Sequence, residues 1–233
     1  MTLVLWDIDH TLIETRGVGG ELYQAAFEEI TGRKLERMPE ITGRTELTIL
    51  AETLKLHGIE PGTEYAAKYT EALARQYEQH GDELRQRGQV LPGAKEALVA
   101  LSRRPTVVQA ALTGNLRAVA MTKLRVFELD QYIDFEVSAY GDDEVDRTKL
   151  VVRAQQRATA RHGTRFNRRN TVIVGDSPSD VETGLEGGAR VIAVASGRTS
   201  AEELRKAGAT TVLNDLVNTP SLARAVSAPD AAE

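Results

Sequence analysis

The sequence predicts an α/β protein: a doubly wound parallel sheet with a helical segment inserted into it. Short apolar runs of strand length alternate with amphipathic segments of helix length, which favours parallel strands joined by helical crossovers. The stretch from about residue 16 to residue 88 breaks this alternation and contains no convincing strand. We therefore expect an α/β core domain formed by residues 1–15 and 89–233. Residues 16–88 are expected to form an all-helical cap domain.

Four continuous apolar runs are typical of strands that are buried on both faces of a parallel sheet. They are residues 2–6, 106–112, 171–174 and 190–195. Residues 133–137 are a weaker candidate for one more short core strand.

Apolar residues at helical spacing separate these strands and also fill the insertion. In the core we expect helices at 94–101, 116–127, 149–161, 181–186 and 201–206. In the insertion we expect helices at 21–30, 45–56 and 65–79. Residues 88–93 are interpreted as the hinge by which the chain returns from the cap. The tail from residue 227 to residue 233 is expected to be frayed.

Composition excludes several classes of function. Lys and Arg total 29 against 34 Asp and Glu, a formal charge of −5, whereas nucleic-acid binders usually carry a basic excess. The absence of cysteine excludes disulfides, cysteine nucleophiles and iron–sulfur clusters. No apolar run reaches the roughly 18 residues of a membrane span, and the N-terminus lacks the basic segment of a secretory signal. We expect a cytoplasmic protein without nucleic-acid or membrane partners, and its oligomeric state stays open.

Acidic residues follow two of the predicted strands. Asp7 and Asp9 follow the first strand, and Asp176 and Asp180 follow the third. Ligands of open α/β sheets bind beyond the carboxyl ends of the strands. Like charges are tolerated together where a cation or a proton shares the site, and carboxylate oxygens suit Mg²⁺. The alternatives are solvated turn aspartates for the first pair and a helix-capping role for Asp180 with Ser177.

Polar and basic residues stand between these two acidic motifs. Thr113, Gly114 and Asn115 follow the second strand, where a hydroxyl and backbone N–H groups at a helix start can bind phosphate. A simple helix cap is the alternative. Arg147 and Lys149 follow in a polar loop, and each could supply a cation to the site. For an isolated basic residue in such a loop, a solvated surface charge is the competing interpretation.

The order of these motifs resembles that of the haloacid dehalogenase superfamily. DxDxT stands at residues 7–11, a strand-end threonine at Thr113, a basic residue after it, and GDxxxD at residues 175–180. The resemblance covers nearly the whole chain, and the helical insertion directly after DxDxT resembles the helical cap of the family. Pro92-Gly93, Thr113-Gly114-Asn115 and Lys123-Leu124 resemble the branch that includes phosphoglycolate phosphatases.

The resemblance implies a role for each motif residue. Asp7 matches the nucleophile that forms an aspartyl-phosphate, and Asp9 matches the general acid and base. Asp7, the backbone carbonyl of Asp9, and Asp176 match the Mg²⁺ ligands of the family. Asp180 matches the supporting acid of the last motif, and Thr113 the hydroxyl that binds the phosphoryl group.

Asp9 also bears on the reaction. The dehalogenases of the family lack a second aspartate because a halide leaving group needs no proton. Its presence here implies a Mg²⁺-dependent phosphatase that acts on a small phosphate monoester. A phosphomutase of the same superfamily, similar to β-phosphoglucomutase, is the alternative. A non-enzymatic phospho-aspartate module is less favoured because such modules are shorter and need no cap.

The chain departs from the family pattern at two positions, and one residue of the insertion is a further candidate. His10 stands where the family often has glycine, and it either accepts the loop conformation or contacts substrate. The third motif commonly has a lysine followed by proline, which is absent here, so Arg147 is the first choice for the active-site cation and Lys149 the second. Arg44 lies in a loop similar to one that reaches the active site in the family. It is expected either to bind a second anionic group of the substrate or to be a surface arginine.

Overall fold

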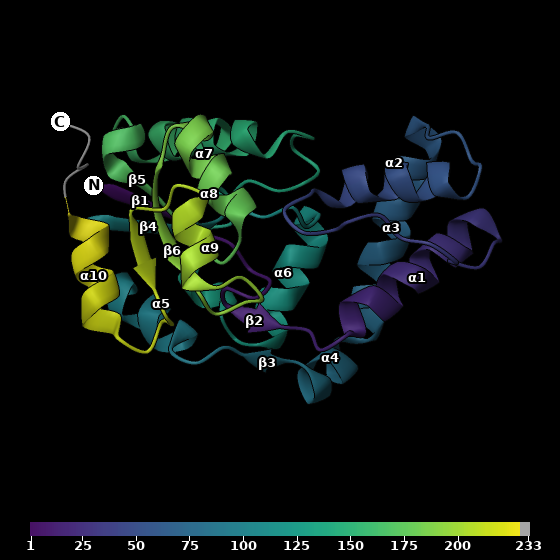
Figure 1. Cartoon of the computed structure of the whole chain (residues 1–233), viewed down its shortest axis with the longest axis horizontal. Coiled ribbons are helices and arrows are strands. Elements are labelled where there is room, and N and C mark those ends of the chain that lie inside the picture. The colour runs from purple at the N-terminus through teal and green to yellow at the C-terminus, as the bar shows by residue number, and fades with distance from the viewer. Residues whose placement is uncertain (229–233) are drawn as a thin grey trace.

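The computed structural model describes residues 1–228, which form an α/β core beside a group of helices (Figure 1). The core sheet contains β1 (Thr2–Trp6), β4 (Val107–Ala111), β5 (Thr171–Gly175), β6 (Arg190–Val194) and β7 (Thr211–Leu213). Its order is β4-β1-β5-β6-β7, and every pairing is parallel. In chain order this is the 2-1-3-4-5 arrangement, which places a topological switch point between β1 and β5. Ligand-binding crevices form at such points.

Helices cover both faces of this sheet, as the doubly wound prediction requires. Val4 and Trp6 of β1 belong to a buried cluster that includes residues of α5 (Ala94–Ser102), α6 (Arg117–Val126) and α10 (Thr219–Ser227). The alternate residues Leu3 and Leu5 pack with α7 (Arg147–His162). A smaller cluster joins β6 to α8 (Pro178–Gly187) and α9 (Ala201–Lys206). This alternation follows from the period-2 geometry of a strand buried on both faces.

The inserted segment packs around a hydrophobic cluster of its own. It contains α1 (Val18–Thr31), α2 (Glu46–Leu56), α3 (Thr63–Gln79) and α4 (Gly81–Arg87). Phe27, Leu50 and Tyr69 are buried in this cluster. Leu116 and Val119, at the start of α6, join it from the core side. The prediction of helices in this stretch is confirmed, while the exact division into core and cap domains stays a prediction.

A two-stranded antiparallel ribbon marks the place where the chain leaves the core and returns to it. The ribbon pairs β2 (Ile13–Glu14) with β3 (Gln89–Val90). The return segment expected as a hinge therefore begins as a short strand. Two-residue strands are too short to produce a hydrophobic period, so the sequence pattern did not reveal them.

The prediction of a short strand at 133–137 is wrong. The short helix η1 (Asp130–Tyr132) precedes a loop that bonds the edge of β4 through separate contacts. The amide of Asp134 donates to the Gln109 carbonyl at 2.8 Å, and the amide of Ala111 donates to the Ser138 hydroxyl at 2.8 Å. These hydrogen bonds pair backbone groups at the edge of β4 without a neighbouring strand. The only strand-like pairing of this loop among the described residues is an isolated bridge between Leu112 and Ala139.

The C-terminal part adds elements that the sequence pattern did not predict. They are η2 (Arg168–Asn170), β7 and α10. Of the tail expected to be frayed, Ser227 is the last residue of α10 and Ala228 is its C-cap. The rest of the predicted frayed tail, at 229–233, lies outside the described residues. None of the helices in the described part of the chain is both long and apolar enough to cross a membrane.

Candidate active site

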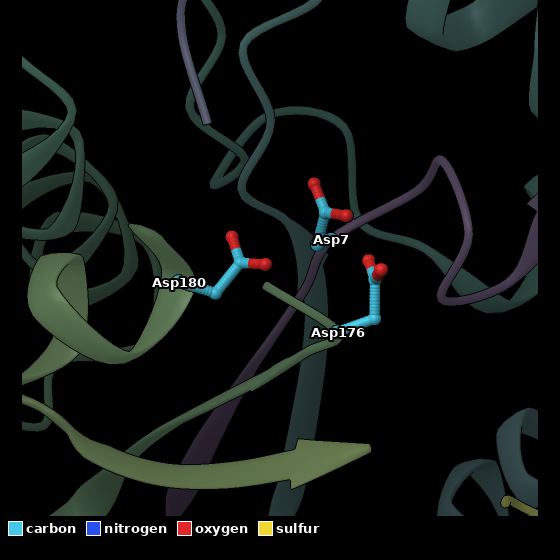
Figure 2. Close-up of side chains that lie close together, drawn as sticks. All are labelled: Asp7, Asp176 and Asp180. Atoms are coloured by element: carbon cyan, nitrogen blue, oxygen red, sulfur yellow. The ribbon is translucent and has the colours of Figure 1, made fainter. Parts of the chain in front are cut away.

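Three aspartates meet at the switch point of the sheet. Asp7 directly follows β1, Asp176 directly follows β5, and Asp180 lies in the first turn of α8. One carboxylate oxygen from each lies within 4.8 Å of the others, and all three residues are buried. Figure 2 shows Asp7 flanked by the other two side chains in that view. The prediction that the two acidic motifs meet is confirmed, and the solvated-turn alternative for Asp7 is wrong.

The start of α8 explains how Asp180 reaches this cluster. Ser177 and Asp180 form a capping box, in which the Asp180 amide donates to Ser177 Oγ at 3.2 Å and the Ser177 amide donates to Asp180 Oδ2 at 3.0 Å. Pro178, at the start of the helix, suits this turn. Asp180 Oδ1 remains directed to the cluster, where it accepts from Arg147 Nη2 at 2.6 Å. Asp180 therefore caps α8 and also lies in the acidic cluster.

Thr11 links the two strand-end acids. Its hydroxyl lies 3.3 Å from Asp7 Oδ2 and 3.2 Å from Asp176 Oδ1, and it can donate its proton to either. The side chain is fully buried. Thr11 thus holds the carboxylates of neighbouring strands in a common orientation.

Arg147 supplies a positive charge to the acidic cluster, whereas Lys149 does not reach it. Arg147 Nη2 lies 3.7 Å from Asp7 Oδ1, and its side chain is 11% exposed. The two residues are the first and third of α7, whose N-cap is Asp146, and Lys149 is exposed. The Nε atom of Arg147 is buried and has no hydrogen-bond partner among the described residues.

Burial and mutual repulsion govern the protonation of the acids. Burial raises the pKa of Asp7 well above its usual value, Asp180 raises it further, and Arg147 opposes the shift. Burial and the charge of Asp180 raise the pKa of Asp176 to about 7. A divalent cation bound between these oxygens would remove the repulsion that both shifts reflect. The donor set consists of carboxylate oxygens, the kind that Mg²⁺ prefers, so the residues present fit this ion.

A second polar cluster holds Asp9 beside the loop of residues 113–115, which follows β4. Lys123 Nζ lies 2.9 and 2.8 Å from the two carboxylate oxygens of Asp9 and donates to Asn115 Oδ1 at 2.7 Å. Asn115 Nδ2 donates to Asp9 Oδ2 at 2.8 Å and to Thr113 Oγ1 at 2.7 Å. Burial alone would raise the pKa of Asp9, but Lys123 and Asn115 outweigh it and lower the pKa. Asp9 is therefore held as a carboxylate.

In the sequence, Lys123 stands out only as part of the Lys123-Leu124 resemblance and is not predicted to be a site residue. It lies on α6, is 4% exposed, and its ammonium stands 5.4 Å from the centre of the Tyr77 ring. The available signal was a lysine on the helix face that also carries the apolar residues Ala120 and Leu124. A lysine on a buried face needs an acidic partner.

The loop before α2 rests on the core at the mouth of this site. The Glu46 amide donates to the Gly114 carbonyl at 2.8 Å, and Ser179 Oγ donates to the Gly43 carbonyl at 3.0 Å. Gly43 has a φ of +72°, and a β-carbon there would overlap the Ser179 side chain. Arg44 turns to an ion pair with Glu52 of α2. The loop therefore brings the helical segment into direct contact with the loop of residues 113–115 and with α8.

A cavity of about 270 Å³ joins both clusters. It is lined by every predicted site residue except Lys149: Asp7, Asp9, Arg44, Thr113, Gly114, Asn115, Arg147, Asp176 and Asp180. Lys123, Glu46 and His10 also line it. His10 has a φ of +63°, the left-handed conformation that glycine adopts without strain. His10 thus accepts the loop conformation and also lies beside the cavity.

The fold and the site together define a doubly wound α/β protein with a buried acidic pocket at its switch point. Residues 4–194 match the family model described as haloacid dehalogenase-like hydrolase. Because the match covers most of the chain, this protein belongs to the haloacid dehalogenase-like hydrolases. A search of curated proteins found no significant match.

Solved structures of the same fold extend over almost the whole chain. A hydrolase from Pseudomonas syringae is 20% identical with a TM-score of 0.69, and the alignment covers 97% of this chain and 99% of that one. A predicted phosphoglycolate phosphatase from Haemophilus somnus is 14% identical with a TM-score of 0.67, covering 96% and 98%. A protein from Thermotoga maritima, provisionally named a β-phosphoglucomutase, is 20% identical with a TM-score of 0.61, covering 97% and 100%. At these identities the similarity shows the fold.

Proposed function

We propose that this hydrolase is a Mg²⁺-dependent phosphatase that cleaves a small-molecule phosphate monoester through an aspartyl-phosphate on Asp7. One observation carries the proposal. The Asp7 carboxylate lies where the acidic cluster meets Arg147, inside a cavity that also contains Asp9. A nucleophile, a cation and a group for proton transfer are the parts that phosphoryl transfer through a covalent intermediate needs.

In the first half-reaction an Asp7 oxygen attacks the phosphorus and the bond to the leaving alkoxide breaks. The alkoxide takes its proton from the protonated form of Asp9, which the pairing with Lys123 makes the minor form, and Asp9 regains this proton from water in the second half-reaction. The Thr113 hydroxyl accepts from Asn115, so its own proton is available to a phosphoryl oxygen. The unpartnered Nε–H of Arg147 is a second donor for that group. Mg²⁺ held by Asp7, the Asp9 carbonyl and Asp176, with Asp180 beside them, would offset charge on the phosphoryl group.

In the second half-reaction water attacks the phosphorus and the bond to Asp7 breaks, which releases phosphate. Asp9 takes the proton of this water. The ionised form of Asp9, paired with Lys123, is the form that this step requires. Arg147 remains beside Asp7 and compensates the charge that returns to its carboxylate.

Phosphate release from a panel of phosphomonoesters tests the proposal. The panel includes p-nitrophenyl phosphate, phosphoglycolate, sugar phosphates and nucleotides, each with Mg²⁺ or with EDTA. We expect turnover that needs Mg²⁺ and is abolished by Asp7→Asn. Asp82→Asn, at an exposed position of α4, is the matched control and should leave turnover unchanged. Near-normal activity of Asp7→Asn would contradict the mechanism.

A phosphomutase is the second candidate, because two solved structures of the same fold carry the name β-phosphoglucomutase. A mutase would return the phosphoryl group to a sugar phosphate and would need a bisphosphate activator. Activity that appears only with such an activator would favour it. A small phosphorylated metabolite as substrate and a cytoplasmic location complete the proposal.

A further inference from the structure

The charged side chains that line the cavity are mostly paired with one another. Asp9 pairs with Lys123, and Asp180 with Arg147. Arg44 is engaged by Glu52. Asp7 and Asp176 belong to the acidic cluster that fits a metal ion. Among the acidic residues that line the cavity, Glu46 alone belongs neither to these ion pairs nor to the acidic cluster.

Glu46 is held in place by the core and by the helical segment together. It is the first residue of α2, and its amide is bonded to the carbonyl of Gly114 at 2.8 Å. Its carboxylate accepts a hydrogen bond from the hydroxyl of the buried Tyr69 at 3.2 Å. Among the described residues, no ion pair involves Glu46. Held at both its amide and its carboxylate, Glu46 has little freedom to leave the cavity.

The surroundings of Glu46 disfavour a second negative charge and favour a hydrogen-bond donor. Burial raises the pKa of Glu46, Lys123 opposes the shift, and Asp9 adds to it. Lys123 is already bonded to both oxygens of Asp9 and to Asn115. A half-buried carboxylate that forms no ion pair gains from a hydrogen-bond donor brought by a ligand. The phosphoryl group, a dianion, belongs on the Arg147 side, so Glu46 faces the remainder of the substrate.

We propose that Glu46 binds an ammonium or hydroxyl group on the leaving-group portion of the substrate. This inference rests on the proposed phosphatase function and names its substrate class: phosphomonoesters of small amino alcohols or polyols. Esters with a carboxylate at the same position, such as phosphoglycolate, are disfavoured because Lys123 offsets only one of the two neighbouring negative charges, those of Asp9 and Glu46.

Four esters of nearly equal size provide the test: ethyl phosphate, 2-hydroxyethyl phosphate, 2-aminoethyl phosphate and phosphoglycolate. We measure kcat/KM for each with the wild type and with Glu46→Gln. For each protein, the kcat/KM of an ester is divided by that of ethyl phosphate, and this ratio is compared between the wild type and the variant. The intrinsic reactivity of each ester is the same for both proteins, so it cancels in the comparison. Loss of a charge-assisted hydrogen bond should reduce the preference for the amino ester by roughly tenfold or more. The relative rate of phosphoglycolate should rise in the same variant.

Two controls separate this effect from a change in folding. Glu71→Gln alters an exposed glutamate of α3 and should leave every ratio unchanged. Binding of 2-aminoethyl phosphate and of ethyl phosphate to Asp7→Asn, measured by calorimetry, should show the same preference without turnover. This second measurement stands even if Glu46→Gln is unstable.

Unchanged ratios in Glu46→Gln would overturn the inference. A wild type that prefers phosphoglycolate, together with an Arg198→Met variant that lacks this preference, would also overturn it. Arg198 is an exposed residue that lines the same cavity and would then be the group that selects a second anion. Failure of the proposed function looks different, because the wild type would then release no phosphate even from p-nitrophenyl phosphate.

Discussion

Lys123 and Asp9, 114 residues apart in the chain, form a two-point ion pair inside the protein. Lys123 comes from α6 and Asp9 from the loop that follows β1. The Lys123 side chain is 4% exposed and the Asp9 side chain 35% exposed. The pair connects Asp9, the proposed acid and base, to α6. This helix also contacts the inserted segment, where the centre of the Tyr77 ring lies 5.4 Å from the Lys123 ammonium.

Replacement of this lysine should impair both stability and one chemical step. Lys123→Met leaves the Asp9 carboxylate without its cation and should lower the free energy of unfolding by about 2 kcal/mol, at the lower end for a broken pair because Asp9 is partly exposed. It should also misplace Asp9. The loss in kcat/KM should then be larger for ethyl phosphate than for p-nitrophenyl phosphate, because p-nitrophenolate leaves without a proton.

Denaturant unfolding and steady-state kinetics on the two substrates measure these effects. Lys34→Met, at an exposed lysine, is the control and should change neither quantity. An equal loss on both substrates would mean that Lys123 does not act through Asp9.

The choice between Arg147 and Lys149 can be tested directly. Arg147→Met removes the cation beside Asp7 and should reduce kcat by at least about 100-fold, the scale seen when a group that stabilises transition-state charge is removed. Lys149→Met alters an exposed side chain and should retain most of the activity. Parallel assays of the two variants decide the matter, and the reverse pattern would assign the role to Lys149.

The acidic cluster predicts how metal and pH affect stability. The pKa of Asp176 is raised to about 7 and that of Asp7 is raised as well, so the metal-free folded protein holds protons that the unfolded chain has lost above about pH 4. Stability of the metal-free protein should therefore fall as the pH rises from about 4 to about 7. Mg²⁺ competes with these protons, so it should raise Tm more at pH 8 than at pH 5.

Thermal unfolding with Mg²⁺ or EDTA at the two pH values checks this dependence. Asp176→Asn removes one of the repelling charges, so it should stabilise the metal-free protein at pH 8 and weaken the response to Mg²⁺. A Tm increase with Mg²⁺ that is the same at both pH values would argue against binding at this cluster.

The contact between Gly43 and Ser179 predicts a separate effect on activity. Gly43→Ala places a methyl group on a residue with a φ of +72° and against the Ser179 side chain, so the loop should move away from the core. Gly58→Ala is the matched control, with a φ of +67° and no atom within 4 Å of the new β-carbon. Each should lower the free energy of unfolding by about 1 kcal/mol or more through backbone strain.

Only Gly43→Ala should also reduce kcat/KM, because only that loop carries Arg44 and Glu46 into the cavity. Equal activity of the two alanine variants would show that the position of this loop has no bearing on catalysis.

Sequence reasoning located the polar ends of the strands better than it located the connections between them. Asp7 and Asp176 follow strongly apolar strands, and parallel pairing brings their carboxyl ends to one edge, so their proximity could be predicted. The prediction of a strand at 133–137 was wrong because Ser138 and neighbouring groups form single hydrogen bonds with the backbone of β4 in place of regular strand pairing. The ribbon of β2 with β3 is too short for a periodic signal.

The sequence by itself determined the alternation of four long apolar strands with helices, the inserted helical segment and the membership of Asp7, Asp9, Asp176 and Asp180 in the two acidic motifs. Those features depend on local periodicity and on residue order. The tertiary structure decided which cation reaches each acid: Arg147 rather than Lys149 for Asp7, and Lys123 for Asp9. It also decided that Glu46 lines the cavity with no partner of opposite charge among the described residues. Pairing of this kind depends on the packing of α2, α6 and α7 against the strand ends. The paired residues are far apart in the sequence, so local periodicity does not predict them.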